Sequence, residues 1–170
     1  MHIVTMVGNY RVGKSALCAL WTTKETCTSY MATFFVESHH LSNLTIYDTP
    51  SHERLHSKVE SYYASTDVFV LVGNEDLDYD NWWARIQPLA PEASWLLVWT
   101  GTTACPKRRK WAADRDILVA YVDLQDMEQS DAAFQQLENI AANHAPRPER
   151  VPLGYYEYLV DGARQWIPCV

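Results

Sequence analysis

Short apolar runs alternate with amphipathic stretches along residues 1–144. The apolar runs are rich in Val, Ile, Leu and Trp and lack strict alternation, which is typical of strands covered on both faces. They predict strands at His2–Val7, Leu44–Tyr47, Val68–Val72, Trp95–Thr100 and Ile117–Val122. Helical periodicity predicts helices at Lys14–Thr23, His52–Ser65, Tyr79–Leu89, Lys107–Ala113 and Gln129–Asn143. Because alternating strands and helices form βαβ units, we expect an α/β fold with a mainly parallel sheet and helices on both faces.

The pattern changes after residue 144. Three prolines interrupt the chain directly after the last predicted helix: Pro146, Pro148 and Pro152. Four aromatic residues follow them: Tyr155, Tyr156, Tyr158 and Trp166. Burying one such side chain contributes about 1.5–3 kcal/mol. We therefore expect one domain over residues 1–144 and a C-terminal extension, residues 145–170, that packs back on it.

Composition and charge narrow the class of protein. With 170 residues, 48% of them hydrophobic and 21% charged, the chain has the size and composition of one globular domain. Its net charge of -7 argues against nonspecific nucleic-acid binding. The cysteines form no CxxC pair, so we expect reduced thiols and a cytoplasmic protein; they are Cys18, Cys27, Cys105 and Cys169.

The segment after the first predicted strand matches the phosphate-binding motif GxxxxGK[ST]. Glycines at its ends let backbone N–H groups turn toward phosphate oxygens, and the following helix adds its dipole. In this motif Lys14 neutralises the β- and γ-phosphates, and the Ser15 hydroxyl ligates Mg²⁺. The predicted nucleotide-binding residues of the segment are Gly8, Asn9, Tyr10, Arg11, Val12, Gly13, Lys14, Ser15 and Ala16.

An acidic residue stands at the end of a second predicted strand. Asp48 follows the run Leu44–Tyr47. In α/β proteins ligands bind at the carboxyl ends of the strands, so we expect Asp48 to hold Mg²⁺ through water.

These segments together resemble a small GTPase of the Ras superfamily, most similar to Rab proteins. Asp48–Arg54, DTPSHER, is similar to the family's DTAGQER, and Ser61–Tyr63 matches the SYY of Rab proteins. Thr33–Glu37, TFFVE, is similar to the Rab switch segment TIGVDF. The resemblance covers about residues 2–144.

The resemblance implies a P-loop NTPase with a Ras-like G domain that binds GTP or GDP with Mg²⁺. It adds Thr33 to Ser15 and Asp48 as a metal ligand. It implies effector or regulator proteins that bind through residues 26–37 and 51–63, and a switch function in vesicle trafficking.

Several residues depart from the family pattern around the γ-phosphate. Ser51 replaces the glycine whose N–H senses the γ-phosphate, and His52 replaces the glutamine that orients the attacking water. The sequence DTPSH also resembles the DTPGH of translational GTPases, whose His handles the water, although a solvated surface role for His52 stays open. The ring of Tyr10 would crowd the γ-phosphate. We therefore expect slow hydrolysis that uses His52 and Lys14, while Arg11 either adds positive charge at the site or faces solvent.

The base-recognition motifs are also altered. The family's NKxD is replaced by Thr100–Thr103, TGTT, and its SAK loop by Asp123–Gln125, DLQ. No carboxylate follows the strand Trp95–Trp99, so discrimination in favour of guanine should fall. The candidate residues around the base are Thr100, Thr103, Asp123 and Leu124. The segment between these motifs is shorter than in Rab proteins, so we expect a fourth helix of one or two turns.

Two further questions stay open at the level of sequence. The chain ends IPCV and has neither a CaaX nor a double-cysteine motif, which leaves membrane association open. A pseudo-GTPase scaffold is the alternative to an active switch, favoured by Tyr10 and by residues 100–103. A P-loop kinase is disfavoured by the match from Asp48 to Tyr63 and by the lack of a second arginine-rich lid.

Overall fold

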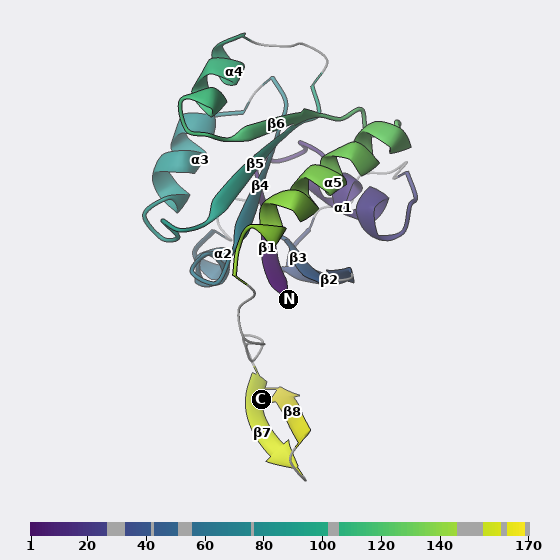
Figure 1. The fold of residues 1–170 in the computed structure, drawn as a ribbon, viewed down its shortest axis with the longest axis vertical. Helices are drawn as coiled ribbons and strands as arrows, with labels where there is room; N and C mark the ends of the chain where they lie inside the picture. The colour runs from purple at the N-terminus through teal and green to yellow at the C-terminus, as the bar shows by residue number, and fades with distance from the viewer. Residues whose placement is uncertain are drawn as a thin grey trace.

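A six-stranded sheet forms the centre of the molecule. The computed structural model describes residues 1–26, 33–41, 43–50, 56–75, 77–101, 106–145, 155–160 and 163–168. The strands of the central sheet are β1 (His2–Val7), β2 (Glu37–Leu41), β3 (Leu44–Asp48), β4 (Val68–Gly73), β5 (Ser94–Trp99) and β6 (Leu118–Tyr121). Their spatial order is β2-β3-β1-β4-β5-β6 (Figure 1). Only β2 is antiparallel to its neighbour, so the sheet is mainly parallel, as predicted.

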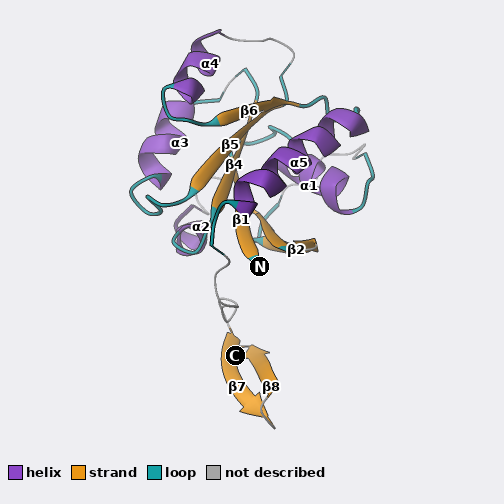
Figure 2. Ribbon diagram, viewed as in Figure 1, coloured by secondary structure: helices purple, strands orange, loops and turns teal. Residues whose placement is uncertain are grey.

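Helices cover both faces of this sheet (Figure 2). They are α1 (Lys14–Thr22), α2 (His56–Tyr63), α3 (Tyr79–Ile86), α4 (Pro106–Ala113) and α5 (Met127–Ala142). One buried cluster joins α1 and α5 to the sheet, and a second joins α2, α3 and α4 to it. In β4 alternate residues enter the two clusters, Val70 one and Leu71 the other. This two-sided burial explains why the strand is apolar without alternation.

Within the described part of residues 1–144, the predicted elements are confirmed to within a few residues, and one strand, β2, was not predicted. The sequence of β2, ESHHL, contains no apolar run, and its residues are exposed or half-buried at the edge of the sheet. A polar edge strand gives no hydrophobic signal, so this strand was missed. The fourth helix has eight residues, which agrees with the expected one or two turns.

The C-terminal extension contains two strands that the sequence analysis did not predict. β7 (Tyr155–Val160) and β8 (Ala163–Pro168) pair antiparallel as a two-stranded sheet of their own. Figure 1 draws this hairpin apart from the six-stranded sheet. The expected packing of residues 145–170 against the domain stays a prediction.

Two further features concern the cysteines and the helices of the described residues. Cys18 is a free thiol in the core, and burial raises its pKa above the ordinary value; the other cysteines lie outside the described residues. Across the described part of the chain, no helix combines the length and apolar character needed to cross a membrane.

Candidate functional site

The loop that joins β1 to α1 depends on two glycines. Gly8 has φ 142°, and a Cβ there would strike the backbone carbonyl oxygen of Val72 on β4. Gly13 has φ 92°, and a Cβ there would lie 2.5 Å from Cδ1 of Leu124. Side-chain-bearing residues rarely adopt such φ values. The loop therefore lies against β4 and the β6–α5 loop in a shape that glycine alone permits.

The N-terminus of α1 opens into this loop. Gly13 is the N-cap residue and offers no side-chain hydrogen bond to the first turn. N–H groups at a helix N-terminus carry partial positive charge and bind anions. The loop and helix thus form a cradle of backbone donors suited to a phosphate group.

Lys14 places a cation inside the same cradle. Its Nζ donates hydrogen bonds to the carbonyl oxygens of Gly8 at 3.1 Å and Asn9 at 3.2 Å. The side chain is only 5% exposed. Burial lowers the pKa of Lys14 to about 8, against an opposing effect of the Asp48 charge. An anion bound in the loop would stabilise this buried charge.

Three oxygen-bearing side chains gather beside Lys14. Asp48, at the end of β3, is 2% exposed, and among the described residues its Oδ1 has no hydrogen-bond partner. Burial raises the pKa of Asp48, while a hydrogen bond from Ser15 and the charge of Lys14 lower it. Ser15 Oγ and Thr33 Oγ1 lie 2.8 Å apart. Neighbouring ligands of an octahedral Mg²⁺ at about 2.1 Å lie about 3.0 Å apart, close to the separation of the Ser15 and Thr33 oxygens, so these residues fit that ion.

Polar contacts connect the loop to two other segments, the residue after β5 and helix α3. The Thr100 hydroxyl, after β5, donates to the carbonyl oxygens of Val12 at 2.8 Å and Gly73 at 3.2 Å. The Trp82 Nε1–H of α3 donates to Asn9 Oδ1 at 2.7 Å. The structure shows that Thr100 positions the loop, and its expected place near a base stays a prediction. The role of Trp82 was missed, because nothing in the sequence relates an α3 side chain to Asn9.

Tyr10 and Arg11 form the outer part of the loop. The Tyr10 side chain is 51% exposed, and the Arg11 guanidinium carbon lies 5.5 Å from the centre of its ring. Arg11 has φ 60°, a left-handed conformation that is strained for a residue with a side chain. The Tyr10 ring therefore lies at the surface of the loop; whether it slows hydrolysis stays a prediction.

The residues expected around a base are only partly described. Asp123 is exposed, and its Oδ1 accepts the Gln125 N–H at 2.9 Å, a common role for Asp in a turn. Leu124 packs against Gly13. Ser51, His52 and Thr103 lie outside the described residues, so their expected roles stay predictions.

Comparison with known proteins gives one finding that bears on this site. The family model described as Ras of Complex, Roc, domain of DAPkinase matches residues 3–102. The matched range contains the loop with Lys14, Asp48 and Thr100, and it runs from β1 through β5. No curated protein matches the chain.

Proposed function

The chain belongs to the Roc family of Ras-like GTPases, and on that premise we propose that it is a Mg²⁺-dependent guanine-nucleotide switch that hydrolyses GTP slowly. One observation carries the proposal: the Lys14 ammonium, in the first turn of the helix capped by Gly13, and the Asp48 carboxylate are both buried and interact electrostatically. Burying a charge is costly unless a ligand compensates it. A phosphate with a divalent cation would compensate both charges.

Both backbone N–H groups and the Lys14 side chain would bind the phosphates. N–H groups of residues 8–13 and of the first turn of α1 would bind the phosphate oxygens, and Lys14 would exchange its carbonyl partners for the β- and γ-phosphates. The hydrogen bonds that Lys14 Nζ donates to the carbonyl oxygens of Gly8 and Asn9 already hold the ammonium group in the loop. Little reorganisation of the protein is then needed when the nucleotide binds.

The residues that would hold Mg²⁺ are Ser15, Thr33 and Asp48, with Asp48 acting through water. When bound, the ion neutralises charge that develops on the phosphate oxygens. Thr33 lies a few residues before β2, so contact with the ligand at this position would couple the nucleotide state to the segment that contains Phe34 and Phe35. The side chains of those two residues are 67% and 80% exposed.

This exposed aromatic pair supports an effector or regulator surface over residues 26–37, together with residues 51–63. We expect His52 to orient the attacking water and Tyr10 to slow the reaction by crowding the γ-phosphate. A cytoplasmic location and a role in vesicle trafficking belong to the same proposal; the first rests on the pattern of cysteines and the second on the resemblance to Rab proteins.

A pseudo-GTPase scaffold is the second candidate. The Thr100 hydroxyl and the Trp82 indole hold the loop through contacts within the protein. A loop supported in this way could keep its shape without turnover. In that case the protein would bind nucleotide permanently or not at all, and the fold would serve as a binding module.

The variant Asp48→Asn tests the metal-dependent part of the proposal. We expect wild type to bind GDP more tightly with Mg²⁺ than with a chelator, because Asp48 helps to hold the ion. The substitution keeps the size of the side chain and removes its charge, so the gain due to Mg²⁺ should fall by roughly tenfold or more. Titration of a fluorescent GDP analogue with and without Mg²⁺ measures this gain.

Asp114→Asn is the matched control for this experiment. Asp114 is an exposed residue that pairs with Lys110 on α4, remote from Ser15 and Thr33 in sequence and in element. The substitution Asp114→Asn should leave the gain in GDP affinity due to Mg²⁺ unchanged. An equal gain from Mg²⁺ in wild type and Asp48→Asn would refute the metal site.

A further inference from the structure

Asn9 joins helix α3 to the cation of the phosphate loop. The Trp82 Nε1–H of α3 donates to the side chain of Asn9 at 2.7 Å. An indole nitrogen can only donate, so the Asn9 atom that faces α3 must be the amide oxygen. The backbone carbonyl oxygen of Asn9 accepts a hydrogen bond from Lys14 Nζ at 3.2 Å. Asn9 is therefore held at its side chain by α3, while its backbone contacts the ammonium group that the phosphates would meet.

Helix α3 is anchored to β5 and α4. The Trp83 ring centre lies 5.1 Å from that of Trp95 on β5 and 6.1 Å from that of Trp111 on α4. Asp80 Oδ1 accepts the Trp111 Nε1–H at 2.7 Å. Trp82 itself is 7% exposed and belongs to the same buried cluster as Trp95 and Trp111. The indole is thus fixed in the core, whereas Asn9 lies in a loop and depends on contacts such as this one for its position.

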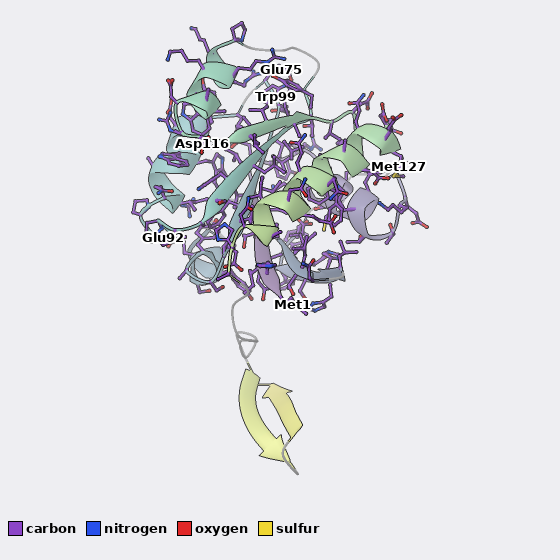
Figure 3. All side chains as sticks on the ribbon, viewed as in Figure 1. Met1, Glu75, Glu92, Trp99, Asp116 and Met127 are labelled. Atoms are coloured by element: carbon purple, nitrogen blue, oxygen red, sulfur yellow. The ribbon has the colours of Figure 1, made fainter. Side chains whose placement is uncertain are left out.

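The direction of α3 explains how Trp82 reaches the loop. Figure 3 shows Glu75 and Trp99 at one end of the sheet and Glu92 at the other. Because α3 follows Glu75 and precedes Glu92 in the chain, its first turn, which contains Trp82, lies toward the Trp99 end. β1, β4 and β5 are parallel, so the loop after β1 lies at that same end.

We infer that Trp82 is a positioning residue that preorganises Lys14 for phosphate binding through Asn9. This inference rests on the proposed nucleotide-binding function and adds to that site a residue from outside the loop. Without the indole N–H, the loop would also adopt arrangements in which the Asn9 carbonyl and Lys14 are displaced. A ligand that binds only the competent arrangement loses apparent affinity in proportion to the fraction of protein that adopts it. Bound phosphates would themselves hold the loop, so the loss should lie in the association rate.

Trp82→Phe tests this contact because it keeps an aromatic ring in the core and removes the indole N–H. Association and dissociation rates of a fluorescent GDP analogue should be measured by stopped flow in Mg²⁺. We expect association to slow about 5- to 10-fold, the size of effect expected for one hydrogen bond. Dissociation should stay within about twofold of wild type.

Trp83→Phe is the matched control, because it replaces the neighbouring indole of the same helix, whose ring packs on β5 and α4. It should lower the midpoint of urea unfolding and leave both rates within about twofold of wild type. A loss of association rate in Trp83→Phe equal to that in Trp82→Phe would assign the effect to general loosening of α3 and overturn the inference.

Asn9→Ala removes the same hydrogen bond from the loop side without altering the core, so it decides the question should Trp82→Phe fail to fold. It should slow association by a similar factor, and the double variant should be no slower than the slower single variant. An unchanged association rate in either single variant, a loss that lies only in dissociation, or a double variant in which the two effects multiply would overturn the inference. Failure of wild type to bind the GDP analogue would instead overturn the proposed function.

Discussion

Gly8→Ala should destabilise the protein by on the order of 3 kcal/mol, the largest loss of stability that we expect from a single methyl group. Two costs add up in this variant. A φ of 142° costs roughly 1–3 kcal/mol for a residue with a side chain, and overpacking by the new methyl group costs a similar amount. The obstacle is the Val72 carbonyl oxygen in the middle of the sheet, and a backbone atom there cannot move without disturbing β4. Urea unfolding followed by circular dichroism measures the change.

Gly13→Ala is the comparison that isolates the cause. Its φ of 92° imposes a similar conformational cost, but the obstacle is the flexible side chain of Leu124. Leu124→Ala should therefore recover part of the loss in the double variant, whereas no side-chain substitution should rescue Gly8→Ala. A loss below about 1 kcal/mol for Gly8→Ala would show that the loop does not need this close approach.

Lys14→Met should reduce affinity for GDP and GTP by on the order of a hundredfold or more. Each hydrogen bond to a charged group contributes about 1.5–3 kcal/mol, and Lys14 is placed to contact two phosphates. Methionine keeps the apolar stem of the side chain in the buried position and removes only the charge. Fluorescence titration with labelled GDP and GTP measures the loss.

The same substitution should not unfold the nucleotide-free protein. Burial lowers the pKa of Lys14 to about 8 from the ordinary 10.5, so its neutral form favours the folded state. The stability contributed in this way is present above pH 10.5 and is lost as the pH falls through about 8. At pH 7 the charged lysine therefore weakens the empty protein, and Lys14→Met should be at least as stable as wild type.

Lys110→Ala is the control for charge alone. Lys110 lies on α4 with its side chain 77% exposed and pairs with Asp114. Removing it should change nucleotide affinity by less than about twofold, since exposed ion pairs contribute little. Equal affinities for wild type and Lys14→Met would show that the loop does not bind phosphate.

The fold could be predicted where burial dictates the sequence. β1, β4 and β5 are covered on both faces, and their unbroken apolar runs identify them as strands without any structure. β2 was not predicted because an exposed edge strand needs no apolar residues. β7 and β8 were not predicted because prolines nearby suggested an irregular segment. Local pattern therefore reports buried strands well and exposed strands poorly.

The sequence also predicts some residues of the candidate site and misses others. The residues from Gly8 to Ser15 are adjacent in the chain, so a motif defines them, and their helix N-terminus follows from their position. The contact of Thr100 with Val12 depends on the pairing of β4 with β5, in which Gly73 is opposite Trp99. Such contacts arise only when the sheet assembles, and no spacing in the sequence indicates them.

The most direct test of a guanine-nucleotide switch is to identify what the purified protein carries. The protein should be purified in Mg²⁺, denatured, and the released small molecules separated by ion-exchange chromatography against nucleotide standards. We expect GDP or GTP at close to one molecule per chain, and none from Lys14→Met prepared in parallel. Release of an adenine nucleotide, or of no nucleotide from wild type, would contradict the account.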